Sequence, residues 1–440
     1  MARTPIEDRY HELHPKSAQL FERARLNFPK GVTHEARNMA PFPIYMTRGQ
    51  GSHKWDVDGN EYVEYNTGHG SMILGQAHPA IVAAVQERMA LGTHLSASSE
   101  LEIRWADLVK QLIPCAEKVR FTSSGTEAVM MAFRMARAYT GRTKVVKFFD
   151  HFHGWSDYAN AGNVKSMDGI PKETLSTMIV LGLPNNGRGG DLDAVEKAIV
   201  GSSDVAAVII ESTGAHMGST PVHPDFLHGL REVTARHGIV FIMDEVVTGF
   251  RASKGGAQEL FGVTPDLCAL AKILGGGLPG GAVAGKADII NVIEREQMLH
   301  QGTFNANPLS ASAGITALEL VATGDVNEKA DAAGAKLKAG LNEVFTRIEV
   351  PGHSYGIGSM VHTRIGIEAG VDQWGIIRGQ STGAAISAET DHQLKMAMLN
   401  NGVDTPRRFL TMAVHTDDDI AQTVEAFEKS LREVRELGLV

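Results

Sequence analysis

The chain has little cysteine and no long hydrophobic run, and each absence removes a class of protein. Its two cysteines among 440 residues, Cys115 and Cys268, lie far apart in the sequence and outside any metal-ligand spacing. A disulfide framework and a zinc site are therefore excluded, and we expect two small apolar thiols and no bound metal. Strand-sized apolar runs are interrupted by Asp, Glu or Gly, so none is long enough to span a bilayer.

An excess of positive charge is also missing. The 42 Lys and Arg residues are outnumbered by 51 Asp and Glu residues, which gives a formal net charge of −9. Nonspecific binding to nucleic acid or to an anionic membrane needs a basic surface, so neither partner is expected. Residues 1–11 carry charges of both signs and no apolar stretch, unlike a signal or transit peptide. We therefore expect a cytoplasmic protein that acts on small molecules.

The apolar pattern that is present predicts an α/β fold. Between about residues 70 and 325, short apolar runs alternate with longer periodic ones, which is typical of a mostly parallel sheet flanked by helices. We predict strands at residues 118–122, 144–149, 178–181, 205–210, 239–244 and 267–271.

The two ends of the chain have different patterns. Residues 52–65 predict a hairpin that turns at Asp58-Gly59. A long helix near residues 328–348 and a final helix capped by Thr416 predict a C-terminal α+β unit. We therefore divide the chain into an N-terminal arm and hairpin (1–70), a large α/β domain (71–325) and a smaller C-terminal domain (326–440).

Two polar residues at predicted strand ends indicate a cofactor. Lys272 follows an apolar strand and precedes three glycines, so its amine should be buried. Burial lowers the pKa of a lysine and makes it a Schiff-base nucleophile. Asp244 ends another apolar strand, where a carboxylate needs a cationic partner. An ion pair or a metal would satisfy Asp244 alone, but an acid and an amine at neighbouring strand ends suggest pyridoxal phosphate.

Two further segments follow predicted strands. Ser124-Gly125-Thr126 begins a helix, where free backbone N–H groups and hydroxyls can bind a phosphate, although an ordinary helix cap explains the same residues. Phe152 and His153 come after the strand at 144–149, where Phe152 could stack on a flat ring or simply fill the core. His151 and His153 have no third donor at a metal-ligand spacing.

Taken in order, Ser124-Gly125-Thr126, Phe152-His153-Gly154, Asp244-Glu245-Val246 and Lys272 resemble the class III aminotransferases of pyridoxal-phosphate fold type I. This resemblance covers nearly the whole chain. It implies an α/β fold with a large cofactor-binding domain and a smaller C-terminal one.

The resemblance also implies roles for these residues. Ser124, Gly125 and Thr126 would bind the cofactor phosphate. Asp244 would pair with the ring nitrogen, and Lys272 would form the Schiff base.

Further cofactor residues follow from the same resemblance. Phe152 and Val246 would cover the two faces of the ring, with His153 and Glu211 beside it. The family usually has Glu-Pro where this chain has Glu211-Ser212-Thr213, so the backbone there is expected to differ. His216 would face the phenolic oxygen, unless it is a structural histidine. Thr303 would reach the phosphate of a neighbouring subunit, which implies a homodimer.

Other stretches resemble particular branches of class III. Residues 31–37, 68–75 and 248–251 are similar to glutamate-1-semialdehyde aminomutases, and Arg37 aligns with their carboxylate-binding arginine. Residues 153–157, 215–222 and 278–281 are similar to D-phenylglycine aminotransferases. Arg407 stands roughly where the aminomutases have a glutamate. A cation there favours carboxylate substrates, although a solvated or ion-paired turn is the alternative.

The expected reaction is therefore amino-group transfer. The favoured donor is a D-arylglycine or a β-amino acid, and the acceptor is an oxo acid such as 2-oxoglutarate. Glutamate-1-semialdehyde 2,1-aminomutase and a racemase on the same cofactor are the alternatives. A regulatory protein that only binds pyridoxal phosphate is disfavoured, because no DNA-binding module accompanies the predicted domains.

Overall fold

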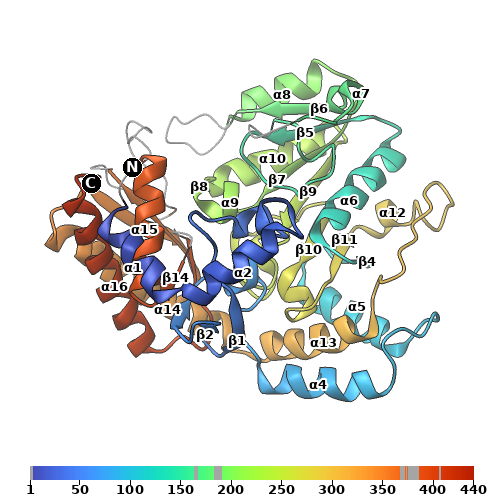
Figure 1. The fold of residues 1–440 in the computed structure, drawn as a ribbon. Coiled ribbons are helices and arrows are strands. Elements are labelled where there is room, and N and C mark those ends of the chain that lie inside the picture. The colour runs from blue at the N-terminus through green and yellow to red at the C-terminus, as the bar shows by residue number, and fades with distance from the viewer. Residues whose placement is uncertain are drawn as a thin grey trace.

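A seven-stranded, mostly parallel sheet forms the centre of the molecule (Figure 1). The computed structural model describes residues 3–162, 167–182, 191–366, 372, 374, 386–405 and 408–440. Only β11 runs antiparallel to its neighbours in this sheet. In spatial order the strands are β4 (Lys118–Thr122), β11 (Gly281–Gly285), β10 (Leu267–Ala271), β9 (Val240–Glu245), β7 (Val205–Glu211), β5 (Lys144–Phe148) and β6 (Met178–Leu181).

Helices cover both faces of this sheet because its central strands are largely apolar and buried. β7 and β10 are buried at every position, as a parallel sheet between two helical layers requires. The helices between residues 67 and 323 are α3 (Thr67–Gly70), α4 (Pro79–Ala90), α5 (Glu100–Leu112), α6 (Gly125–Thr140), α7 (Lys172–Ser176), α8 (Leu192–Val200), α9 (Ala215–Gly218), α10 (Pro224–Arg236), α11 (Gly256–Phe261), η3 (Lys272–Gly275), α12 (Ala287–Ile290) and α13 (Pro308–Thr323). A two-residue strand, β8 (Thr220–Pro221), follows α9.

The N-terminal segment contributes a second sheet. Its strands lie in the order β1 (Met46–Gln50), β2 (His53–Asp56), β3 (Glu61–Glu64) and β14 (Val403–Asp404). The predicted hairpin is therefore confirmed as β2 and β3, and β14 from the C-terminal region pairs with β3 in parallel. Before this sheet come α1 (Pro5–Leu13), α2 (Pro15–Arg25), η1 (Pro29–Gly31) and η2 (Glu35–Arg37).

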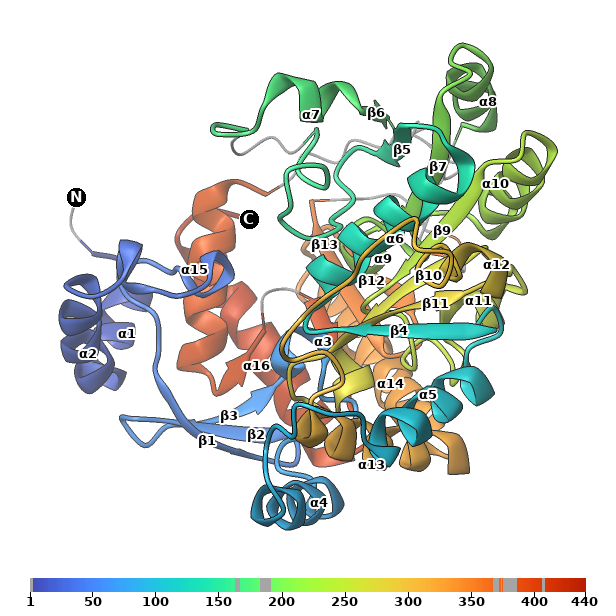
Figure 2. The same ribbon diagram turned by 90° about the vertical axis from the view of Figure 1, so that its right-hand side faces the viewer.

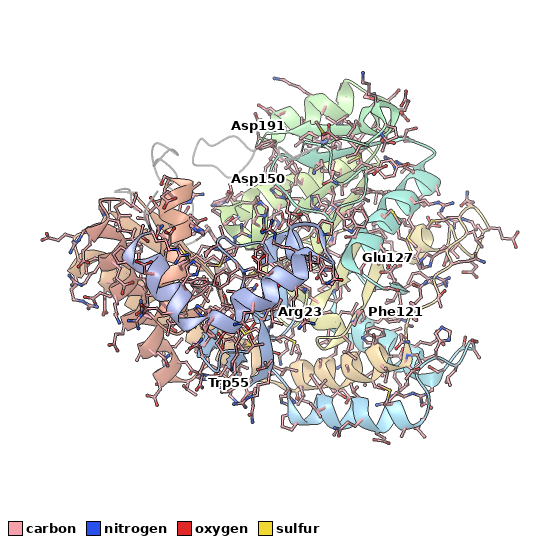
Figure 3. All side chains as sticks on the ribbon, viewed as in Figure 1. Arg23, Trp55, Phe121, Glu127, Asp150 and Asp191 are labelled. Carbon is pink, nitrogen blue, oxygen red and sulfur yellow. The ribbon has the colours of Figure 1, made fainter. Side chains whose placement is uncertain are left out.

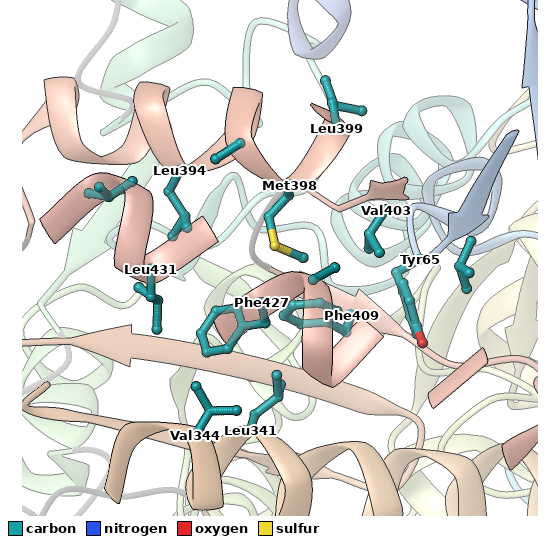
Figure 4. Packing of buried hydrophobic residues seen from close by; sticks show 14 of the residues in the cluster. Tyr65, Leu341, Val344, Leu394, Met398, Leu399, Val403, Phe409, Phe427 and Leu431 are labelled. Carbon is teal, nitrogen blue, oxygen red and sulfur yellow. The ribbon is translucent and has the colours of Figure 1, made fainter. Parts of the chain in front are cut away.

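The C-terminal region has an antiparallel sheet and long helices. The sheet contains β12 (Gly352–Ile357), β13 (Met360–Ile365) and β15 (Arg408–Leu410). Its helices are α14 (Val326–Arg347), α15 (Ala388–Asn400) and α16 (Asp417–Glu436). One hydrophobic cluster joins this region to the N-terminal segment, as Figure 4 shows for Tyr65 beside Phe409 and Phe427.

The strands predicted from the apolar runs are all present, and so are the two C-terminal helices. The antiparallel strand β11 was not predicted. The domain boundaries at residues 70 and 325 remain a prediction. The first and last of these segments share one hydrophobic cluster, so they do not have separate cores. Cys115 and Cys268 are both buried and free, and their sulfur atoms lie 3.5 Å apart although they are distant in sequence.

Candidate active site

A cavity of about 760 Å³ lies at the carboxyl ends of the central strands. Ligands in open α/β sheets bind at this edge, because the loops that follow the strands converge there. The residues that follow β4, β5, β7, β9 and β10 all reach this cavity. In Figure 3, Phe121 marks β4 and Glu127 marks the first turn of α6, and the cavity-lining residues 123–126 lie between these two in the chain.

Lys272 lies at the end of β10 with an unusual backbone. Its φ angle is 57°, and the 3-10 helix η3 begins at this residue. A left-handed φ costs a non-glycine residue about 1–2 kcal/mol, so such residues concentrate where the chain must aim a side chain. Burial lowers the pKa of the amine, while the charges of Asp244 and Glu211 raise it. The lysine predicted from the sequence is therefore a buried amine in the cavity.

Asp244 is held by two groups of the protein. The Val246 N–H donates to Oδ1 at 3.0 Å, and His153 Nδ1 lies 2.7 Å from Oδ2. Burial holds the pKa of His153 well below its ordinary value, so its ring is neutral and donates from Nδ1. Burial raises the pKa of Asp244 to about 6, against the effects of the Val246 N–H and the Lys272 charge. A cation at the free side of this carboxylate would favour its charged form.

Glu211 lies beside Asp244 at the end of the neighbouring strand, where the two residues are register partners. Its carboxylate accepts the backbone N–H groups of Phe152 and His216 at 2.7 and 3.1 Å. Burial raises its pKa to about 7, with a further contribution from the charge of Asp244. Two buried carboxyl groups and one lysine therefore share the floor of the cavity, which suits a ligand with a cationic group.

The start of α6 offers backbone donors to the cavity. Ser124 caps the helix by accepting the Glu127 N–H, and none of the described residues accepts the N–H of Gly125 or Thr126. A Cβ on Gly125 would come within 2.9 Å of Val246, and one on Gly154 within 2.6 Å of the Thr126 hydroxyl. Unpaired N–H donors at the start of a helix, next to closely packed glycines, form a site for an anion such as phosphate.

The cofactor residues named from the sequence, apart from Thr303, all line this cavity. Phe152 is 56% exposed, so a ring face is available there. The His216 ring, next to the cavity, contacts Asp150 at 3.1 Å.

Two of the predicted residues lie elsewhere, and a third is not among the residues that the structure describes. Thr303 is exposed, and its carbonyl oxygen lies 2.7 Å from His94 Nε2. Arg37 lines a neighbouring cavity, and its guanidinium donates to Thr33. Arg407 falls outside the described residues.

Sequence reasoning missed several residues of the cavity. Arg408 and His69 line it, and neither stands at the end of a strand of the central sheet. Thr213 also lines it, and its hydroxyl is buried without a hydrogen-bond partner. A signal for Arg408 existed in the two consecutive arginines before an apolar run, of which the sequence-based prediction named Arg407.

Within the described residues, no group of three or more His, Cys, Asp or Glu side chains is arranged to hold a metal ion. In the same part of the chain, none of the helices combines the length and the apolar character needed to cross a membrane.

The fold and the cavity define a pyridoxal-phosphate enzyme of fold type I, and the chain belongs to the class III aminotransferase family. It matches the family Aminotransferase class-III over residues 34–431. It is 38% identical over 435 residues to glutamate-1-semialdehyde 2,1-aminomutase 2 of Brevibacillus brevis, with 95% of this chain and 98% of the relative covered.

Solved structures agree. The fold is similar to an omega-transaminase from Sphaerobacter thermophilus, at 34% identity and a TM-score of 0.86 over 95% of this chain and 98% of that one. It is also similar to a β-phenylalanine aminotransferase from Variovorax paradoxus, at 29% identity and a TM-score of 0.81 over 96% of each chain. The predicted fold type, family and dependence on pyridoxal phosphate are thereby confirmed.

The cavity fits this cofactor in three respects. The carboxyl group of Asp244, whose pKa is raised by burial, would be stabilised in its charged form by a protonated ring nitrogen. The free N–H groups of Gly125 and Thr126 can donate hydrogen bonds to a phosphate. The buried amine of Lys272 has the lowered pKa that Schiff-base formation requires.

Proposed function

We propose that this protein is an aminotransferase that moves an amino group from a carboxylate-bearing amino acid to an oxo acid. The observation that carries the proposal is the position of Arg408. It is the one arginine among the described residues of the active-site cavity, which also contains Lys272. An arginine binds a carboxylate with two parallel hydrogen bonds and so fixes the orientation of the substrate.

The roles of the other residues follow from their environment. Pyridoxal phosphate, when bound, supplies an electron sink for the substrate carbon. Asp244, fixed by His153 and Val246, would pair with the ring nitrogen. Gly125 and Thr126 would hold the phosphate.

Proton transfer falls to Lys272. Because burial lowers the pKa of its amine, Lys272 can take a proton from the substrate and return it. Its position at the start of η3, directly after a buried strand, holds the amine at one place in the cavity. Leu410, a buried side chain, also lines this cavity and gives part of its wall an apolar character.

The donor class is the finer part of the proposal. The similar structure from Variovorax paradoxus is described as a β-phenylalanine aminotransferase, and sequence resemblance favours D-arylglycines as well. Both donors combine a carboxylate with an aromatic group. An arginine would bind the carboxylate, and a large cavity with apolar walls would take the aromatic group. A cytoplasmic location, expected from the sequence, belongs to the same proposal.

The second candidate is glutamate-1-semialdehyde 2,1-aminomutase. The identity of 38% to the Brevibacillus brevis aminomutase favours it. The consecutive cations at positions 407 and 408, where the aminomutases have a glutamate, favour the aminotransferase.

The half-reaction separates the two candidates. The pyridoxal form of the enzyme is titrated with D-phenylglycine or β-phenylalanine in the absence of any oxo acid. An aminotransferase converts its cofactor stoichiometrically to the pyridoxamine form and releases the corresponding oxo acid. An unchanged spectrum with both donors, together with production of 5-aminolevulinate from glutamate 1-semialdehyde, refutes the proposal. Arg408→Gln is expected to raise KM for the carboxylate donors by about tenfold or more, equivalent to one lost charged hydrogen bond.

The proposal includes a homodimer. The residues of α4 are all at least partly exposed, although the helix contains several apolar side chains. Leu91 and Phe304 are 65% and 60% exposed on two loops that contact each other through His94 and Thr303. An apolar surface of this kind is typical of a subunit interface. A second copy on this surface would cover the loop that carries Thr303.

A further inference from the structure

A histidine separates the active-site cavity from a second cavity. The second cavity has a volume of about 400 Å³ and is lined by residues of the N-terminal segment together with residues of α15 and β14. Among the described residues, Ala36, Asn66 and His69 line both cavities. The two cavities are therefore neighbours, and these three residues stand between them.

The backbone that carries His69 is strained. Four consecutive residues of α3 have positive φ angles: 45° for Thr67, 58° for Gly68, 57° for His69 and 95° for Gly70. Each of the two non-glycine residues costs about 1–2 kcal/mol in this conformation. The turn is fixed from outside, since Arg251 Nη2 donates to the Gly70 carbonyl at 3.3 Å. Strain that the surroundings maintain in this way is concentrated at functional sites.

The surroundings of His69 keep its ring neutral. Its pKa is lowered to about 4, first by burial and then by the charged forms of His34, Arg37, Lys272 and Lys54. None of the described residues forms a hydrogen bond with its ring nitrogens. The ring is therefore uncharged and flat, with one nitrogen that can donate and one that can accept a hydrogen bond, and it lines the same cavity as Lys272.

His34 completes this wall. Its ring stacks on His69 with the centroids 5.0 Å apart and the planes 22° from parallel. The Ala36 N–H donates to Nδ1 of His34 at 3.0 Å, which fixes the ring relative to η2. The stacked pair thus joins the N-terminal segment to the turn beside Lys272.

The second cavity has an apolar lining. Its side chains include Phe28, Met39, Pro43, Ile44 and Leu399. Lys54, which also lines it, is paired with Asp404 and Glu64, so its charge is compensated. An aryl or alkyl group fits these apolar side chains, and Arg37 and Lys395 are the other cationic residues of the lining.

We infer that the stacked pair of His34 and His69 is a partition that limits the length of the substrate, and that the second cavity can take an apolar substituent when the partition is open. The inference rests on the proposed binding of the substrate carboxylate by Arg408. The ligand class is an amino or oxo acid with an aryl group on an extended chain. His69 is the specificity-determining residue, because its ring stands in the passage.

Ligand binding tests the partition without turnover. Phenylacetate and 5-phenylpentanoate carry the same carboxylate and ring at different separations, and their Kd values are measured by calorimetry with the cofactor-loaded enzyme. In His69→Ala, the Kd ratio should shift by about tenfold in favour of the longer acid. In His69→Phe, which keeps a flat ring, the ratio should stay close to that of the wild type. An unchanged ratio in His69→Ala, or an equal shift in His69→Phe, overturns the inference.

A second test variant and a control variant complete the experiment. His34→Ala removes the other half of the stack and should shift the ratio in the same direction, which provides a test if His69→Ala loses its cofactor. His353→Ala removes a partly buried histidine of β12 and should leave the ratio unchanged. Because binding alone is measured, a shifted ratio in an enzyme that fails to transaminate would refute the proposed reaction and leave the partition in place.

Discussion

Lys272 carries an amine in a buried position, and burial disfavours the charged form of that amine. Its reactivity follows from this lowered pKa. Lys272→Ala should reduce turnover by more than about a thousandfold, because both the nucleophile and the proton carrier are removed. Steady-state rates check this expectation. The matched control is Lys147→Met, since Lys147 is also a buried lysine of the central sheet with a lowered pKa, and it donates to the Ala159 carbonyl. Near-normal rates in Lys272→Ala, or an equal loss in the control, would contradict the assignment.

Glu211 makes the stability of the cofactor-free protein depend on pH. Its pKa is raised to about 7, so the folded protein keeps a proton that the unfolded chain releases near pH 4.5. The folded state then loses stability as pH rises through this window. Glu211→Gln removes the effect, so the unfolding free energy of the variant relative to the wild type should increase by about 2–3 kcal/mol between pH 4.5 and pH 8.

Urea denaturation at both pH values measures this difference. Glu428→Gln is an informative control, because hydrogen bonds from Arg347 and Arg432 lower the pKa of Glu428. The relative stability of that variant should change with pH in the opposite direction. A pH-independent difference for Glu211→Gln would show that the Glu211 carboxyl group titrates normally.

The sequence predicted the residues at strand ends and missed those that tertiary structure brings in. Lys272 and Asp244 could be found because each ends an apolar strand, and parallel strands align their carboxyl ends. His69 follows β3 of a different sheet, so no local pattern connects it with Lys272. Arg408 belongs to β15, and the pairing of this short strand with β13 cannot be specified from three residues of sequence.

At the scale of elements, the final helix was predictable because its signals are local. Thr416 accepts the Asp419 N–H, and the Asp419 side chain accepts the Thr416 N–H. In contrast, β11 has the sequence Gly-Ala-Val-Ala-Gly, in which small residues give no clear strand signal. It exists because it fills the space between β10 and β4, and that pairing is visible only in three dimensions.

The cap of α16 can be tested directly. Thr416→Ala should lower the unfolding free energy by about 1 kcal/mol, because the Asp419 N–H loses its acceptor. Thr416→Ser keeps the hydroxyl and should lose much less. Thermal unfolding of both variants distinguishes the cap from simple packing of the threonine methyl group, since equal losses would assign the effect to the methyl group.

At the scale of the whole molecule, the exposed apolar surface near α4 should be an interface between two copies. Leu91→Glu places a charge at its centre and should convert the dimer to a monomer in light scattering, with weaker cofactor retention because the Thr303 loop loses its partner. Val200→Glu is the control, because Val200 is 68% exposed at the end of α8, far from α4 in Figure 2. A monomeric wild type, or a dimer that persists in Leu91→Glu, would contradict this expectation.

The shared cluster of the first and last segments affects how the chain is made. Thr4 donates to Gln393 and Asn400 donates to the Ile6 carbonyl, so α1 depends on α15 for its partners. On a ribosome, synthesis of the intervening residues takes on the order of tens of seconds. During that time Ile6 and Tyr10 lack the part of their cluster that α15 and α16 supply, whereas the central sheet can already assemble. The first helices to emerge are therefore among the last to fold, and for that interval the nascent chain presents an apolar segment that chaperones can bind.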